Sequence, residues 1–168
     1  MVRRIVVFAV VSLVVLFVLQ QLALADLRRL ESAYIGAREP TACATQSLAP
    51  MAFNQDQSKL PETVLRLVTQ ASEESVRLER RFREGDHVRM PLPALRRSER
   101  AIGRALAAQV ALYDAMVAEP DASEPKLRTL GLANTAAERQ LAQARRLLLA
   151  SETDAWKRRF VCDRAGSG

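Results

Sequence analysis

The chain has 168 residues, of which 49% are hydrophobic and 5% aromatic, and its formal net charge at pH 7 is +6. Alanine, leucine, arginine and glutamate dominate, which is the composition of helices and not of sheets. One histidine and two cysteines, with no Cys-x-x-Cys pair, exclude the common zinc-finger and c-type haem signatures.

An uncharged apolar segment opens the chain. It covers residues 5–25, follows Arg3 and Arg4, and has the roughly 20 apolar residues that a membrane-spanning helix needs. Two interpretations fit this segment. It is either a secretory signal, cleaved after Ala23-Leu-Ala25, or an uncleaved anchor.

The anchor is favoured because the apolar periodicity continues past the cleavage site, through Leu27, Leu30 and Tyr34. Both interpretations place the N-terminus in the cytoplasm and the rest of the chain outside, although the arginines at 28–29 reduce the charge asymmetry. We therefore expect a single-pass protein of a bacterial inner (cytoplasmic) membrane with a periplasmic, or more generally exoplasmic, domain.

The chain divides into three predicted parts: a transmembrane helix with an exoplasmic extension at residues 1–38, a linker at 39–60, and a helical bundle domain at 61–168. The linker prediction rests on Pro40 and Pro50, which disfavour helix. Its apolar side chains Leu48, Met51 and Phe53 indicate a segment that lies over a surface.

Three long helices are predicted in the third part, starting near Pro61, near Ala94 and after Ser123, and the first two end at Glu84 and Val117. Apolar residues alternate at spacings of three and four along them, which predicts an antiparallel three-helix bundle and an all-α fold. The predicted core positions are Val64, Val68, Ala71, Ser75, Leu78 and Phe82; Leu95, Ile102, Leu106, Gln109, Tyr113 and Met116; and Leu127, Leu130, Asn134, Ala137, Leu141, Ala144 and Leu148.

The end of the chain allows two predictions. In an oxidising compartment Cys43 and Cys162 predict one disulfide that ties the linker to the tail, the alternative being two unrelated thiols. A cap at 151–154 predicts a final short helix carrying Trp156 and Phe160, unless the preceding helix runs straight through.

No catalytic, cofactor-binding or metal-binding signature is found in the sequence. His87 has no nucleophile motif and no companion at metal-ligand spacing. Paired carboxylates such as Glu73 and Glu74 are expected to form surface ion pairs with arginines one turn away. We therefore expect a non-catalytic protein with no cofactor and no small-molecule substrate.

Basic residues should gather at one end of the bundle, because antiparallel helices bring the end of one beside the start of the next. The predicted basic docking residues are Arg77, Arg80, Arg81, Arg83, Arg89, Arg96, Arg97, Arg100, Arg145, Arg146, Lys157, Arg158 and Arg159. The predicted apolar docking residues are Leu48, Met51, Phe53, Trp156 and Phe160. An acidic protein face is the first expected partner of the basic end and anionic membrane lipid the second, whereas nucleic acid is not expected.

These features favour a non-catalytic accessory subunit that docks on the exoplasmic face of a larger membrane protein complex. An energy-transducing complex, photosynthetic or respiratory, is the suggested host. The alternative hypothesis is a secreted or anchored helical module that binds a ligand, acts as a sensor, or serves as a chaperone.

Overall fold

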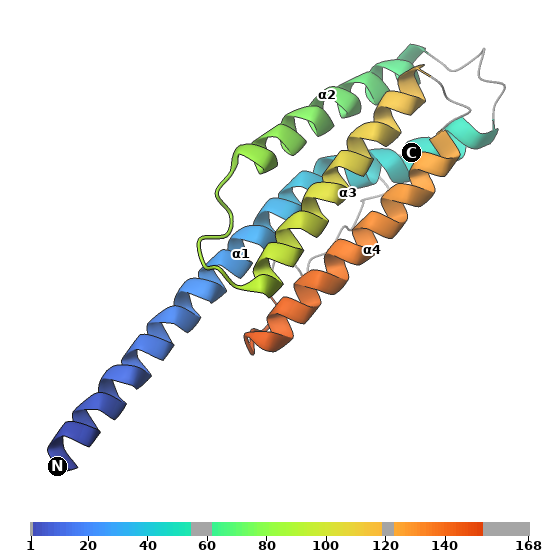
Figure 1. Ribbon diagram of the computed structural model, residues 1–168. Helices are drawn as coiled ribbons and strands as arrows, with labels where there is room; N and C mark the ends of the chain where they lie inside the picture. The colour runs from blue at the N-terminus through green and yellow to red at the C-terminus, as the bar shows by residue number, and fades with distance from the viewer. Residues whose placement is uncertain (1, 55–61, 119–122, 153–168) are drawn as a thin grey trace, which may run out of the picture.

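The computed structural model describes residues 2–54, 62–118 and 123–152, and does not describe the side chains of residues 2–6, 39–54, 63 and 64. Within these ranges the chain is helical, which confirms the predicted all-α class. The helices are α1 (Val2–Asn54), α2 (Glu62–Glu84), α3 (Pro93–Ala118) and α4 (Ser123–Leu147). Figure 1 shows α1 and α3 running in one direction and α2 and α4 in the other.

The first helix has two parts with different surroundings. With 53 residues it is about 80 Å long at 1.5 Å per residue. Its N-terminal part, residues 7–22, projects beyond the other helices and its side chains are exposed. This part makes α1 long and apolar enough to cross a membrane. By length and composition α3 qualifies as well, but much of it is buried in the bundle.

The second part of α1 is a member of the bundle. Ala23, Leu27, Leu30, Tyr34 and Ala37 recur every three or four residues, and each is at most 4% exposed. They share one apolar core with residues of α2, α3 and α4. The predicted bundle of three helices is therefore wrong in its helix count, because α1 continues past the apolar segment and packs as a fourth.

The predicted linker at 39–60 is also wrong over most of its length. The backbone of α1 remains helical as far as Asn54, through Pro40 and Pro50. The prediction took the prolines, and a composition rich in Ala, Gln, Ser and Thr, as signs of a linker. Four alanines, with Gln46 and Leu48, supply strong helix propensity in this stretch.

The other three helices follow the sequence pattern closely. The observed starts of α2, α3 and α4 lie within one residue of the predicted ones. All six core positions predicted for α3 are buried. The two polar residues among the predicted core positions of α2 and α3 bond to each other, since the Gln109 Nε2 donates a hydrogen bond to the Ser75 Oγ at 3.2 Å. Asn134, predicted to lie in the α4 seam, is half-buried.

The last helix ends at Leu147 and does not run straight through. Leu149 has a positive φ of 52°. Its N–H donates to the carbonyl of Arg146, and the N–H of Ala150 donates to the carbonyl of Arg145. These two bonds form a Schellman cap, in which glycine is the usual residue at the left-handed position.

Two predictions fall outside the described residues. The short helix with Trp156 and Phe160 belongs to residues 153–168. Cys162 lies there too, and the side chain of Cys43 is among those not described, so the structure gives the predicted disulfide no support.

Candidate docking surfaces

A buried carboxylate fixes the bundle to α1 where the apolar segment ends. Asp26 is 2% exposed. Its Oδ2 accepts hydrogen bonds from the backbone N–H groups of Arg89 and Met90, both at 2.8 Å. Its Oδ1 accepts one from the side chain of Arg29 at 3.2 Å. The turn between α2 and α3 is therefore tied to α1 one residue after Ala25, the predicted cleavage position.

A buried ion pair lies on the same side of the bundle. Arg145 of α4 contacts Glu31 of α1 through its Nε, and the two residues are 6% and 1% exposed. Arg145 also reaches Glu152 at 3.4 Å. The sequence predicted Arg145 as part of an exposed docking surface, and this is wrong. Its neighbour Arg146 points out of the core and is exposed, so one step along the helix separates a core residue from a surface residue.

The basic end of the bundle is the end from which the apolar part of α1 projects. Figure 1 shows the end of α2, the start of α3 and the end of α4 together there. Segments 26–31, 77–100 and 145–152 hold twelve arginines against seven aspartates and glutamates, so this end has a net positive charge. We call it the basic end.

Ion pairs neutralise only part of the basic end. Four of the predicted arginines pair with carboxylates near them in the chain: Arg77 with Glu74, Arg83 with Glu79, Arg89 with Asp86 and Arg96 with Glu99. Five others are exposed and have no ion pair among the described residues: Arg80, Arg81, Arg97, Arg100 and Arg146. Lys157, Arg158 and Arg159 lie outside the described residues.

The histidine in the turn after α2 makes structural contacts. The His87 Nε2 lies 3.1 Å from the carbonyl oxygen of Phe82. Its ring stacks on the Phe82 ring with the centroids 4.5 Å apart. A Cβ on Gly85 would lie 2.5 Å from that nitrogen, so a larger residue there would force the histidine ring to shift. Among the described residues, no group of three or more His, Cys, Asp or Glu is placed to hold a metal ion.

A polar network joins α1 to α4 further from the apolar segment. The Tyr34 hydroxyl donates to the Asn134 Oδ1 at 3.3 Å and accepts from the Arg38 Nη1 at 3.0 Å. Arg38 also pairs with Glu138 at 2.6 Å. Burial raises the pKa of Tyr34 to about 12, with Arg38 lowering it and Glu138 raising it. The half-buried Asn134 of the α4 seam therefore links α4 to α1.

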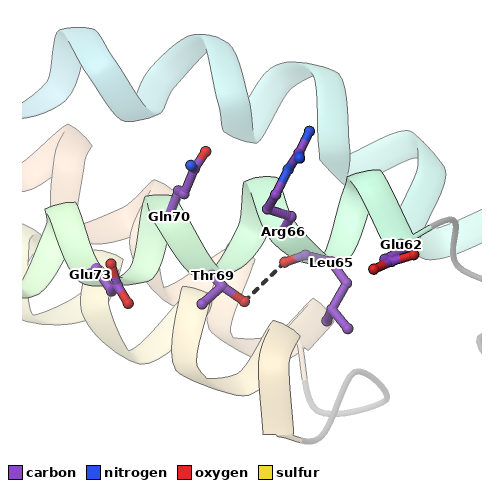
Figure 2. Close-up of a pocket in the computed structure, with 6 residues that line it drawn as sticks. All are labelled: Glu62, Leu65, Arg66, Thr69, Gln70 and Glu73. Carbon is purple, nitrogen blue, oxygen red and sulfur yellow. Dashed lines mark hydrogen bonds between the residues drawn. The ribbon is translucent and has the colours of Figure 1, made fainter.

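The opposite end carries a hollow beside α2. It is about 540 Å³ in volume and is lined by Glu62, Leu65, Arg66, Thr69, Gln70 and Glu73. Figure 2 shows Arg66 and Gln70 pointing to the side of α2 along which the α1 ribbon runs. Leu65 is 46% exposed, so apolar and charged groups mix here. Sequence reasoning missed this surface because Leu65 falls between the seam positions.

The predicted apolar docking residues cannot be placed on either surface. The side chains of Leu48, Met51 and Phe53 are not described, although their backbone belongs to α1. Trp156 and Phe160 lie in the segment after residue 152. Comparison of the chain with protein-family models, with curated proteins and with solved structures found no match.

Proposed function

We propose that the chain is a non-catalytic accessory subunit, anchored by α1 in a bacterial inner membrane, that docks on a larger membrane protein complex. The bundle lies on the periplasmic side and the N-terminus in the cytoplasm. The observation that supports this most is the double use of α1, whose residues 7–22 are exposed while residues 23–37 carry core positions. A bundle built on its own anchor keeps a fixed height above the membrane.

The fixed height suits docking to a partner in the same membrane. Asp26 and the Glu31–Arg145 pair resist pivoting between α1 and the rest of the bundle, because both cross from α1 to another segment. The exposed apolar side chains of the span, such as Phe8 and Phe17, can pack beside partner helices. The hollow around Leu65 and Arg66 is the surface proposed to meet the partner above the membrane. An energy-transducing complex remains the proposed host.

Site-specific photocrosslinking in native membranes tests this proposal. A photoreactive amino acid replaces Arg66 in the hollow or, as the control, Leu132 on α4, which is 74% exposed. Position 66 should give one adduct of defined mass, to a membrane protein that also co-purifies at fixed ratio in mild detergent. A chain that purifies alone, with no adduct at position 66 or with the same adducts at both positions, would contradict it.

A ligand-binding module is the second proposal, and the volume of the hollow favours it. Small-molecule sites have volumes of about 300 to 1,000 Å³, and the hollow falls in this range. Native mass spectrometry of the purified full chain distinguishes the two. A bound small molecule lost in an Arg66→Glu variant would support ligand binding, whereas a bare chain that retains its protein partner would support docking.

A further inference from the structure

The uncharged segment of α1 is only just long enough to cross the hydrocarbon core of a bilayer. The uncharged stretch 5–25 is 21 residues long and rises about 31 Å as a helix, against a hydrocarbon core of about 30 Å. Yet Ala23, inside that stretch, is already 1% exposed within the bundle. The basic end must therefore touch the membrane surface, and any tilt of α1 brings it closer.

The bundle also reaches below Ala23 toward the membrane. A hollow of about 260 Å³ is lined by Leu19 and Gln20 of α1, Met90 and Leu92 of the turn, and Leu148 and Leu149 after α4. Leu19 and Gln20 lie about one helical turn on the membrane side of Ala23. The turn and the end of α4 are thus apolar at the level where the span leaves the bilayer.

Leu149 is an unusual residue for its position at the end of a helix. It has the left-handed conformation that favours glycine, and it is 88% exposed. Leu147 is 63% exposed on the same end of α4. A leucine that is both strained and open to solvent indicates a contact that the isolated bundle does not supply.

Arginines occur at the same end of the bundle as these leucines. Arg146 precedes Leu147, and Arg97 and Arg100 stand in the first two turns of α3, which starts at the same end. Side chains of a helix lean toward its N-terminus, so those of Arg97 and Arg100 lean toward the membrane. Each basic residue near an anionic surface is attracted to it, whereas an apolar side chain gains by leaving water for the acyl boundary.

We propose that the basic end of the bundle docks on the lipid bilayer, with Leu147 and Leu149 inserted at the acyl boundary and Arg97, Arg100 and Arg146 on anionic headgroups. The proposal rests on anchoring by α1 but not on the existence of a protein partner. It also assigns the basic end to lipid and not to the acidic protein face that the sequence analysis expected as its first partner.

Tryptophan quenching in vesicles tests the insertion. The full chain, with Trp156→Phe as background, carries Leu149→Trp and is reconstituted in equal parts of phosphatidylcholine and phosphatidylglycerol with brominated acyl chains. Leu132→Trp, in α4 at a distance from the basic end, is the matched control. Leu13→Trp, 66% exposed in the span, reports whether α1 is inserted.

The account predicts quenching and a blue-shifted emission for Leu149→Trp and Leu13→Trp, and neither for Leu132→Trp. Quenching at Leu13→Trp without quenching at Leu149→Trp would overturn the docking and leave the basic end to an acidic protein. Quenching at both Leu149→Trp and Leu132→Trp would also overturn it, since the bundle would then lie on its side. Absence of quenching at Leu13→Trp would overturn the anchor itself.

Two sets of variants separate the contribution of the arginines from that of Leu149. Arg97→Gln with Arg100→Gln should remove the extra quenching that phosphatidylglycerol gives over phosphatidylcholine alone, whereas Arg66→Gln with Lys126→Gln, on the far half of the bundle, should not. Leu149→Gly should raise the urea midpoint in detergent, because glycine suits the left-handed cap. It should also lower quenching of a reporter at Leu147→Trp. If lipid charge has no effect, the headgroup contact is wrong.

Discussion

Residues 7–22 and 23–38 of α1 belong to one helix and yet have different surroundings. The first part is uncharged and mostly apolar, and its side chains are exposed. The second part is apolar along one stripe, and its buried carboxylates bond to other segments: Asp26 to the turn after α2 and Glu31 to Arg145, with the second oxygen of Glu31 left without a hydrogen-bond partner among the described residues. A helix that is apolar all round is suited to lipid, and one with a stripe is suited to a bundle. Under the proposed anchoring, the change from one pattern to the other places the membrane boundary within about one turn of Ala23.

The largest expected effect in the bundle part comes from Glu31→Ala. This variant leaves Arg145 buried without its α1 carboxylate, and such a loss costs about 3 to 5 kcal/mol. Urea unfolding of the full chain in mild detergent, followed by circular dichroism, measures the change. Replacing the pair together, as Glu31→Ala with Arg145→Met, should recover much of it. Equal losses for the single and double variants would show that the pair is not coupled.

Matched leucines test the two parts of α1 directly. Leu27→Ala removes a core side chain that is 2% exposed and should lower the free energy of unfolding by about 2 to 5 kcal/mol. Leu16→Ala, where the side chain is 63% exposed, should change it by less than about 0.5 kcal/mol. Similar losses at both positions would mean that the boundary is placed wrongly.

The junction between the two parts depends on Asp26. Asp26→Ala strips the backbone N–H groups of Arg89 and Met90 of their acceptor and should cost about 2 to 3 kcal/mol. Asp26→Asn keeps one acceptor oxygen and should cost less. Hydrogen exchange at the amides of Arg89 and Met90 gives the local readout, and it should rise more in the alanine variant. Unchanged exchange would exclude these bonds.

The smallest effect is a pH dependence from Tyr34. Its pKa is raised to about 12 by burial, so the folded state keeps the phenol proton at pH values where the unfolded state has lost it. Stability from this group is therefore complete below pH 10 and is lost as the pH rises toward 12, by about 2 kcal/mol. Tyr34→Phe should be less stable than the natural chain at pH 8 and should lack this alkaline loss. Parallel pH profiles for the two would contradict the assignment.

The sequence alone predicted three of the four helices within a few residues, because Val68, Ile102 and Leu141 recur in phase with buried neighbours and prolines mark the breaks. It also indicated the stripe through Leu27, Leu30 and Tyr34. It did not show that this stripe has partners in α3 and α4, since burial against distant segments is not written in local periodicity. For the same reason Arg145 was taken as a surface residue.

The docking surfaces were predicted in part. The gathering of arginines at one end follows from antiparallel order, and Figure 1 shows that order. Which way this end faces depends on α1 packing as a fourth helix, whereas the sequence pattern predicted residues 1–38 as a helix separate from a three-helix bundle. The hollow around Leu65 had no signal, because exposed leucines in an amphipathic helix look the same whether or not they line a cavity.

The central claim is that α1 is one uncleaved helix that both anchors the chain and completes the bundle. Intact mass spectrometry of the chain extracted from its native membranes tests this most directly. The account predicts a membrane-retained species that includes residues 1–25 and resists alkaline extraction. A soluble species that begins at Asp26 would contradict it, because the span and the core position at Ala23 would then be absent from the mature protein.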